Sequence, residues 1–405
     1  MPDASCPTKK SSPAPEVDAT ALRELHAHFA ALPDPRMWRE VSHPLGSVLF
    51  IALCAVICGA ESFADMECYA RSQERWLRTV IPMAKRGAPS HDTFNRVLSA
   101  LHWHDFEGAV REWTRSLLPP GTAGKQEEPM QYCADGKVQR GSRTADALSG
   151  QNRFVATVNV WAASHGLVID QRRIPEEGSE ITALQLLLKH LHLKDAVVSM
   201  DAAHAQDDTL DAIINRGGDY LVSLKENQPT AYAEVTAQLE SAAAQRKPDF
   251  ESVEKGHGRV DTRHLWVLKE LSSLNTRSRW KGLEAIVLCE RESFRLRTGK
   301  TTTGRRFLLT SLRAEAATLA LCIRRHWQVE NNVHWVLDVV FREDAHRARS
   351  GYAATNLSLL RKIALNLLRL HTTPGDRTSL KGRRLMAAWN HDYLLDAITP
   401  ILGQP

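Results

Sequence analysis

One glutamate, Glu330, stands between two His-Trp pairs in the stretch LCIRRHWQVENNVHW at residues 321–335. If this stretch is helical, the spacing of four residues places His326, Glu330 and His334 along one face. Such a face is too polar for the interior of a simple hydrophobic core. The stretch therefore indicates a metal site, one member of a cluster of catalytic carboxylates, or a structural network of satisfied polar groups.

Two aspartates occupy the ends of predicted strands. Asp135 ends the first strand, directly before Gly136, and Asp201 ends the fourth strand after the apolar run AVVSM. Side chains there project from the carboxyl ends of a sheet, where α/β folds place their binding sites. The alternative for each aspartate is that it caps a following turn or helix. A third carboxylate, Glu330 on a helix beyond the sheet, favours a shared site.

Three carboxylates in one place repel each other strongly. Two unit charges ~4 Å apart repel by about 4 kcal/mol at an effective dielectric constant of roughly 20. Divalent cations remove that cost, and Mg²⁺ suits the site because it takes oxygen ligands, keeps waters and binds phosphates. Two such ions ~3.5–4 Å apart can activate a water or a 3′-hydroxyl group and stabilise the oxygen that leaves a phosphodiester. The residue types therefore predict metal-dependent phosphodiester chemistry.

A zinc site is the alternative for the helical stretch. The spacing His326-x₃-Glu330-x₃-His334 is workable on a helix, but zinc hydrolases usually need a ligand from elsewhere and a base. Nothing near this stretch supplies either, so we favour Glu330 as the third metal carboxylate. We expect the two tryptophans to be packing residues. The alternative is that they stack on the bases of a nucleic acid.

The elements that would position these residues follow from the pattern of the sequence. Residues 20–117 show the 3.6-residue periodicity of helices. The apolar run at 44–60 is shorter than the ~20 residues of a membrane span, so we expect a buried helix of a helical domain. The stretch GTAGKQEEP at 121–129 is typical of a linker.

After the linker the pattern changes to strands. QYCADGK, FVATVNVWAAS and LVIDQRRI are short β-rich runs, with SHG as a hairpin turn between the last two. ITALQLLLKHLHL then predicts an amphipathic helix, DAVVSMDAAHA a strand that ends at Asp201, and DYLVSLKEN a further strand after another helix. Three antiparallel strands followed by helix-strand units indicate a mixed α/β layer architecture.

The composition is that of an ordinary globular protein. The 405 residues are 43% hydrophobic and 24% charged, with a formal net charge of +5 and a pI near 8.8. This mild basicity is compatible with a polyanionic partner. Seven cysteines without a CxxC pair indicate neither a zinc knuckle nor a disulfide framework, so we expect a cytoplasmic protein. The Pro- and Ser-rich residues 1–20 lack the apolar stretch of a signal peptide and predict a disordered lead-in.

Eight motifs occur in a fixed order along most of the chain. They are LPDPR at 32–36, CGAESFADM at 58–66, PSHDTFNRV at 89–97, ADGKVQRGS at 134–142, GGDYLVSLKENQP at 217–229, GHGRVDTR at 256–263, HWQVENNVHWVLDVVFREDAHRAR at 326–349 and LKGRRLMAAWNHDYLL at 380–395. On these motifs the chain resembles the transposases of bacterial insertion sequences in the H-repeat-associated family, which have a DDE ribonuclease H-like catalytic core. One motif alone would be weak, but eight in the family order make chance an implausible explanation.

This resemblance implies a catalytic site, its cofactors and its partners. Asp135, Asp201 and Glu330 match the three catalytic carboxylates, which would hold two Mg²⁺ ions, with Mn²⁺ as a substitute. The implied partner is double-stranded DNA, both the terminal repeats of the element and the target, and the protein would self-associate on that DNA. No membrane is implied, and the expected location is the cytoplasm, in association with the nucleoid.

The resemblance also implies an α/β fold with a ribonuclease H-like catalytic core, a β-rich insertion and an N-terminal all-helical domain. We expect a helical domain at 21–120, a catalytic domain at 128–372 with the insertion at about 230–312, and a basic C-terminal tail with a short helix at 373–405. The gap between Asp201 and Glu330 is about twice the gap between Asp135 and Asp201, which leaves room for the insertion. In related transposases such insertions help to handle the DNA strands at the transposon end.

The helix around Glu330 departs from the wider superfamily. Related transposases carry a tyrosine, an arginine and a lysine around this glutamate, at positions where the present chain has Ile323, His326 and Leu337. Arg324, Arg325 or His326 is expected to supply the phosphate contact instead. The way in which the strands are handled, including any hairpin intermediate, is left open.

Other basic residues are candidates for DNA contact. Lys225 follows the fifth predicted strand beside the proposed site and is the best single candidate for a phosphate ligand. Several more follow the Glu330 helix, where they could track a DNA backbone: Arg347, Arg349, Arg361, Lys362, Lys381, Arg383 and Arg384. Charged helices are usually solvated faces, which is the alternative for each of them.

The sequence thus predicts a DNA transposase that cuts at the ends of its insertion element and joins them to target DNA. One alternative is a catalytically impaired or domesticated descendant that only binds DNA. The three carboxylates argue against that alternative, whereas Ile323 and Leu337 mildly favour it. The other alternative is a metal-dependent nuclease without strand transfer.

Overall fold

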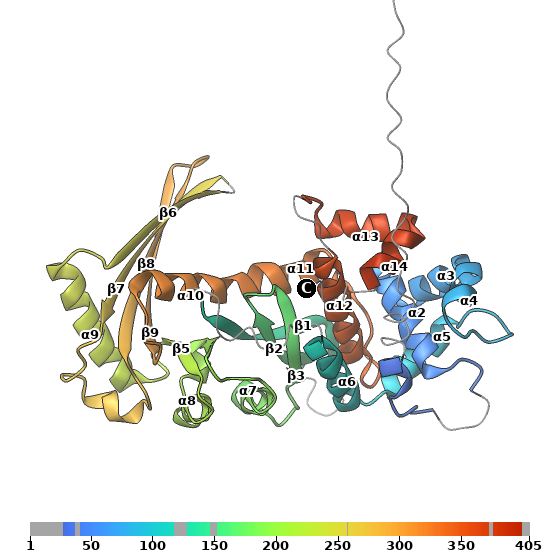
Figure 1. Cartoon of the computed structure of the whole chain (residues 1–405), viewed down its shortest axis with the longest axis horizontal. Coiled ribbons are helices and arrows are strands. Elements are labelled where there is room, and N and C mark those ends of the chain that lie inside the picture. Colours follow the sequence, from blue (N-terminus) through green and yellow to red (C-terminus); the bar gives the residue numbers. More distant parts are fainter. Residues whose placement is uncertain are drawn as a thin grey trace, which may run out of the picture.

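The computed structural model describes residues 27–36, 41–116, 128–145, 152–256, 258–371 and 376–398 (Figure 1). The lead-in predicted at 1–20 and nearly all of the linker predicted at 121–129 lie outside these residues. In the described chain, helices come first, a large sheet with helices on both faces follows, and the last elements are again helices. The architecture is a mixed α/β fold with N-terminal helices, as the sequence predicts.

The N-terminal helices share one hydrophobic core. They are α2 (Leu45–Cys58), α3 (Phe63–Ser72), α4 (Glu74–Val80), α5 (His91–Ala100) and α6 (Trp103–Ser116). Nearly every residue of α2 is buried, and the helix ends at Gly59, whose φ of 115° is a conformation that glycine adopts without strain. The buried helix predicted at 44–60 is therefore confirmed. In the described part of the chain no single helix is long and apolar enough to cross a membrane; α2 and α3 meet that test only as a pair bent by 97°.

The strands predicted after the linker form the first half of the sheet. They are β1 (Met130–Ala145), β2 (Asn152–Ala162), β3 (Leu167–Arg173), β4 (Ala196–Met200) and β5 (Asp219–Leu224). β2 pairs antiparallel with both β1 and β3, while β4 pairs parallel with both β1 and β5. The predicted antiparallel run followed by helix-strand units is therefore confirmed.

Asp135 does not end its strand, which corrects the prediction from the sequence. β1 pairs with β4 only as far as Cys133, opposite Ser199, but its pairing with β2 continues past Asp135, which lies opposite Asn159. The hydrogen bonds to β2 keep β1 extended beyond the end of β4. Asp135 therefore lies just past the carboxyl end of the parallel pair, and Asp201 directly follows β4 at the same edge.

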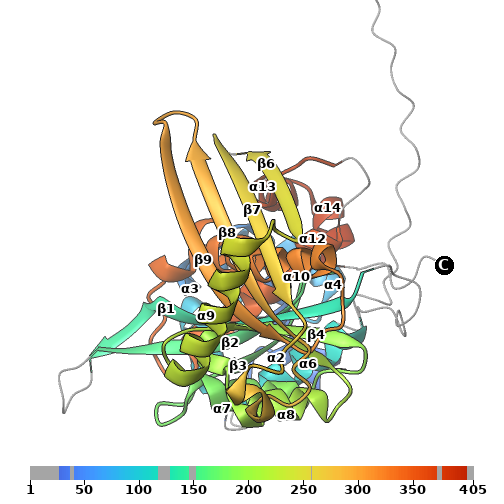
Figure 2. The same cartoon turned by 90° about the vertical axis from the view of Figure 1, so that its left-hand side faces the viewer.

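The predicted insertion continues the same sheet instead of forming a sheet of its own. It comprises α9 (Pro229–Gln245), β6 (Phe250–Gly256), β7 (Arg259–Leu268), β8 (Ala285–Arg295) and β9 (Lys300–Thr310). The last residues of β9 pair antiparallel with β5, and the order across the sheet is β3-β2-β1-β4-β5-β9-β8-β7-β6. Figure 2 shows the far ends of β7, β8 and β9 standing clear of the body of the protein.

Helices cover both faces of the sheet (Figure 1). On one face α7 (Glu180–Leu188), α8 (Asp207–Ile214) and α9 share a hydrophobic core with the strands. On the other face α10 (Ala316–Val329) packs on the sheet through residues such as Leu319 and Ile323. A buried hydrogen bond of 2.8 Å from Gln131 Nε2 to the carbonyl oxygen of Cys322 joins α10 to β1. This contact directs the end of α10 to the edge where Asp135 lies.

The C-terminal helices belong to the core of the N-terminal helices. They are α12 (Ala353–Leu370), α13 (Leu380–Trp389) and α14 (His391–Ile398). Residues 376–398 of the predicted basic tail therefore form two packed helices, where one short helix was expected. The guanidinium group of Arg384 donates to the carbonyl oxygen of Val56 at 2.9 Å, and that of Arg383 donates to Leu368 at 2.8 Å. Both arginines thus satisfy carbonyl groups in the last turns of neighbouring helices.

Four of the cations expected to track DNA are buried: Arg361, Lys362, Arg383 and Arg384. The prediction that they follow a DNA backbone is wrong, because a phosphate group cannot reach side chains inside the protein. Arg347, Arg349 and Lys381 are exposed. A sequence pattern does not separate a cation that pairs inside the protein from one on a solvated helix face.

Gly351 allows a close contact between the segment before α12 and the end of α5. Its φ is 49°, and a Cβ atom at this position would overlap with the carbonyl oxygen of Ser99, which accepts a hydrogen bond from the amide of Tyr352 at 2.9 Å. We expect Gly351→Ala to lower the free energy of unfolding by about 2 kcal/mol or more, from backbone strain and overpacking. Urea unfolding measures this. Gly304→Ala, in open space on β9, should change it by less than about 0.5 kcal/mol, and an equal effect of both would contradict the argument.

Candidate metal centre

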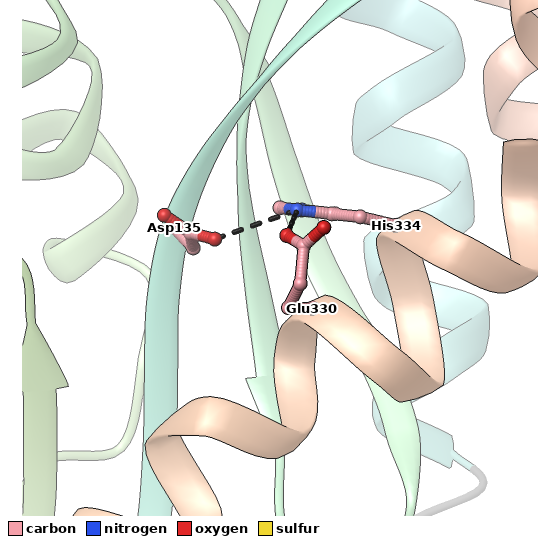
Figure 3. A group of neighbouring side chains, drawn as sticks. All are labelled: Asp135, Glu330 and His334. Atoms are coloured by element: carbon pink, nitrogen blue, oxygen red, sulfur yellow. Dashed lines mark hydrogen bonds and ion pairs between the residues drawn. The ribbon is translucent and has the colours of Figure 1, made fainter. Parts of the chain in front are cut away.

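A π-helical turn, Glu330–His334, joins α10 to α11 (Trp335–Val339). The amide of Trp335 donates to the carbonyl oxygen of Glu330, five residues earlier instead of four. Figure 3 shows that the side chains of Glu330 and His334 meet Asp135 of β1 on one side of this turn. Such turns inside α-helices are frequent at functional sites. The predicted helix is thus confirmed, with a widened turn that the sequence does not reveal.

His334 contacts both carboxylates. Its Nδ1 lies 3.1 Å from Glu330 Oε2 and 3.4 Å from Asp135 Oδ2 (Figure 3). One ligand atom from each of the three residues lies within 4.8 Å of the others, so the group could hold a metal ion. The side chain of Glu330 is 63% exposed and that of Asp135 is 23% exposed. The group is therefore open to solvent on the side of Glu330.

Asp201 lies at the same edge but outside this group. It directly follows β4 and precedes a short 3₁₀ turn, η1 (Ala202–His204). The ring of His326, from α10, has Nε2 3.8 Å from Asp201 Oδ1 and Nδ1 3.2 Å from Ser199 Oγ. The structure thus brings Asp135 and Glu330 together with His334, and it sets Asp201 beside His326.

The pKa of Asp135 is shifted by burial and by the charges around it. Burial raises the pKa of Asp135 to about 6. The His326 ring opposes this increase, while the charges of three other carboxylates add to it: Asp201, Glu180 and Glu330. A cation among these groups would remove the repulsion. Since the carboxylates offer oxygen ligands, the donor set fits a hard divalent cation.

Positive charges surround Asp201. Its pKa is lowered, first by the neighbouring His326 ring, against burial, and further by the charges of Lys225 and Arg306. Lys225 is exposed and directly follows β5. The guanidinium carbon of Arg306, on β9, lies 3.2 Å from the ring centre of Trp327. Arg306 is not recognisable as a site residue from the sequence, because only the pairing of β9 with β5 brings it to this edge.

His334 is neutral near pH 7. Burial, together with the charge of Lys137, lowers the pKa of His334 to about 4. Its Nε2 lies 3.5 Å from Nδ2 of Asn159, and with Nε2 as acceptor the ring hydrogen is on Nδ1, which donates to Glu330. In this tautomer Nδ1 carries the hydrogen and His334 holds the Glu330 carboxylate, whereas ligation of a metal through Nδ1 would require the hydrogen on Nε2.

The zinc site considered for His326, Glu330 and His334 is not formed among the described residues. The group of converging ligand atoms contains Asp135 in place of His326. The ring nitrogens of His326 face Ser199 and Asp201 instead. The alternative of a structural polar network is retained in part, because His334 both contacts and orients the carboxylates.

The two arginines before His326 are engaged in ion pairs. Arg324 pairs with Glu254 of β6, and Arg325, whose side chain is 13% exposed, pairs with Glu128. The third residue expected to contact a phosphate on this helix, His326, lies beside Asp201. Arg347 and Arg349 lie exposed on the segment after α11.

Lys137, two residues after Asp135, is a buried cation. Its Nζ lies 2.6 Å from Asp338 Oδ1 on α11 and 3.7 Å from Glu343 Oε2. Strand periodicity places Lys137 on the same face of β1 as Asp135, which is the only sign of this role in the sequence. The ion pair joins the two elements that carry Asp135 and Glu330.

Comparison with known proteins gives consistent matches. The sequence matches the family described as DDE_Tnp_1-associated over residues 26–114 and the family described as Transposase DDE domain over residues 130–367. "H repeat-associated putative transposase YhhI" of Escherichia coli (strain K12) is 30% identical over 384 residues, which cover 93% of this chain and 98% of YhhI. "Uncharacterized protein in dhlA 3'region" of Xanthobacter autotrophicus is 34% identical over 290 residues, which cover 71% of this chain and 94% of that protein.

A solved structure also aligns with the chain. It is the piggyBac transposase in a synaptic complex with hairpin DNA, at 9% identity over 94% of this chain and 82% of that chain. The TM-score is 0.41, which is too low to support an argument.

We expect Asp135→Asn to raise the melting temperature of the metal-free protein at pH 7.5, with a smaller effect at pH 5. The folded-state pKa of about 6 exceeds the usual 3.8, so the ionised carboxyl group destabilises the fold above pH 6. This cost disappears as the pH falls toward 4. Thermal unfolding in a chelator measures both values, with the exposed Asp208→Asn as control. A lower melting temperature of Asp135→Asn at pH 7.5 would contradict the predicted cost.

Proposed function

The chain belongs to the DDE transposases of bacterial insertion sequences, in the H-repeat-associated family, and from this membership we propose that it cleaves DNA at the ends of its insertion element and joins them to target DNA. The observation that carries the proposal is the meeting of Asp135 and Glu330 at the sheet edge where β4 leads into Asp201. Carboxylates gathered in this way suit a centre for divalent ions.

We assign β1–β5 with α7, α8 and α10 to a ribonuclease H-like catalytic core. The strand order β3-β2-β1-β4-β5, with helices on both faces, supports this assignment. The proposed division places a helical domain at 21–120 and a catalytic domain at 128–372, with α9 and β6–β9 as its insertion. The insertion shares the sheet with the core, so it is a lateral extension of the catalytic domain.

Asp135, Asp201 and Glu330 are the proposed metal ligands, for two Mg²⁺ ions or for Mn²⁺ in their place. When bound, such ions activate a water or a 3′-hydroxyl group and stabilise the leaving oxygen. His334 would hold Glu330 by donating its Nδ1 hydrogen. Burial raises the pKa of Asp135, and the charges of the neighbouring carboxylates raise it further, which supports a site that a cation would stabilise.

The proposed partner is double-stranded DNA, which the protein would bind in the cytoplasm, on the nucleoid, as a self-associated complex. Lys225, with its positive charge near Asp201, is assigned to a phosphate close to the reacting bond. Arg347 and Arg349 would contact flanking phosphates, which position the DNA without reading its sequence. Arg324 and Arg325 would first have to leave their ion pairs, so their proposed contribution is secondary.

A second candidate is a descendant that binds DNA but cleaves it poorly. Ile323 is 4% exposed and Leu337 is 0% exposed, so neither position can touch DNA directly. Related transposases have a tyrosine and a lysine there, and this difference favours the second candidate. A nuclease without strand transfer is separated from both by an assay that joins pre-cleaved ends to target DNA.

We expect Glu330→Gln to abolish cleavage of end DNA with Mg²⁺, by more than about 100-fold, because a ligand charge is lost. The amide oxygen still accepts the hydrogen bond from His334, so the melting temperature of the metal-free protein and the affinity for DNA should change little. Asp201→Asn should behave in the same way. Glu315→Gln, at the other end of α10 with a side chain that is 91% exposed, is the matched control. Full activity of Glu330→Gln would exclude Glu330 as a metal ligand.

DNA binding should weaken steeply as salt increases, because each neutralised phosphate releases counterions. We expect Lys225→Ala to make the slope of log K against log salt shallower by about 0.9, which corresponds to one phosphate contact. The control is Lys281→Ala. Lys281 is an exposed lysine whose Nζ donates to Asn215, directly after α8, and its removal should leave the slope unchanged. A wild-type affinity that is independent of salt would contradict a protein that binds the DNA backbone.

A further inference from the structure

A fourth carboxylate, that of Glu180, lies against the backbone next to Asp135. Glu180 opens α7, whose first turn is capped by Ser179. Its Oε1 and Oε2 lie 2.6 and 2.8 Å from the place that a Cβ atom on Gly136 would occupy. Any side chain at position 136 would therefore collide with this carboxylate.

The same carboxylate contacts the segment that follows Asp201. His204, three residues after Asp201, is completely buried, and its Nε2 lies 3.1 Å from Glu180 Oε1. The other ring nitrogen of His204 has no hydrogen-bond partner among the described residues. With its hydrogen on Nε2, the ring donates to Glu180 and thereby fixes the carboxylate. Glu180 thus touches the chain beside both aspartates, and its side chain is still 37% exposed.

The simplest structural explanation accounts for only part of this arrangement. A glutamate in the first turn of a helix is stabilised by the helix dipole, whatever lies around it. That effect requires neither the close approach to Gly136 nor a buried histidine whose ring has Glu180 as its hydrogen-bond partner. Both features hold the carboxylate beside Gly136 and His204, on the face of the sheet that α7 covers, near the edge where Asp135 and Asp201 lie.

We infer that Glu180 is a fourth carboxylate of the metal centre, which accepts hydrogen bonds from the waters of a bound divalent ion, and that His204 is its positioning residue. This inference rests on the proposed function. Mg²⁺ and Mn²⁺ at such centres keep several waters, and those waters need acceptors beyond the direct ligands. Glu180 is suited to this role because it is both fixed by His204 and open to solvent.

The test is a titration of the full-length protein with Mn²⁺ alone, without DNA, in which free Mn²⁺ is followed by electron paramagnetic resonance. Loss of an outer-shell partner typically weakens metal binding about 10–100-fold, and we expect Glu180→Gln to weaken at least one Mn²⁺ by that amount. Glu177→Gln makes the same change at an exposed position three residues earlier and should bind as the wild type does. Wild-type affinity of Glu180→Gln would overturn the inference.

The outcomes also separate this inference from the proposed function. If Asp135→Asn loses Mn²⁺ while Glu180→Gln keeps it, only the role of Glu180 is excluded. If the wild type binds no Mn²⁺, or if Asp135→Asn binds it normally, the metal centre itself is excluded and the inference with it.

A second pair of variants tests the contact directly. The methyl group that Gly136→Ala adds should displace the Glu180 carboxylate and weaken Mn²⁺ binding about as much as Glu180→Gln does. In a Glu180→Ser background, Gly136→Ala should have no further effect, because the two residues act through one contact. Equal losses from Gly136→Ala in both backgrounds would show that Gly136 acts independently of Glu180 and would overturn this part of the inference.

Discussion

A buried ammonium group, that of Lys137, connects the strand that carries Asp135 to the helix that carries Glu330. It lies 2.6 Å from Asp338 and 3.7 Å from Glu343, and its side chain is only 6% exposed. Inside a protein, removal of one partner of such a pair leaves an uncompensated charge, which costs several kcal/mol. The relative position of Asp135 and Glu330 is therefore tied to an interaction that the fold cannot easily give up. The candidate centre depends on this connection, which acts together with the hydrogen bond between Gln131 of β1 and Cys322 of α10.

The acidic side of this connection depends in turn on α12. Glu343 is completely buried, accepts a hydrogen bond of 2.6 Å from Ser358, and has its pKa lowered against burial by the charges of Lys362 and Arg361. These residues sit on the helix that packs against α2 and β3. Two of the buried cations that the sequence indicates as DNA contacts, Arg361 and Lys362, are therefore counter-charges for the network behind the centre. The N-terminal helices, through α12, therefore help to hold the candidate centre in place.

The sequence predicts the parts of this site that depend on local pattern. The sequence predicts Asp201 at the end of a short apolar strand and Glu330 on a helix, because strand length and helical periodicity are visible in the chain itself. The position of Asp135 within β1 cannot be predicted from the sequence, because it depends on the continued pairing of β1 with β2 beyond the end of β4. The π-turn at Glu330 and the burial of Arg361 likewise follow from tertiary packing. His334 was noticed from its spacing, but its contact with Asp135 requires the folded sheet.

The continuity of the sheet has a mechanical consequence for the insertion. β9 begins at the exposed end of the β6–β9 strands and ends with four residues paired to β5, directly before the segment that leads into α10. Arg306, next to that paired segment, lies over Trp327 of α10 and its charge reaches Asp201. The insertion cannot swing relative to Asp201 without breaking the hydrogen bonds between β5 and β9, because β9 belongs both to the insertion and to the sheet that carries β5. Under the proposed function, a DNA strand bound by the insertion would be held at a set distance from the metal centre, so the geometry of strand handling follows from the sheet and not from a flexible hinge.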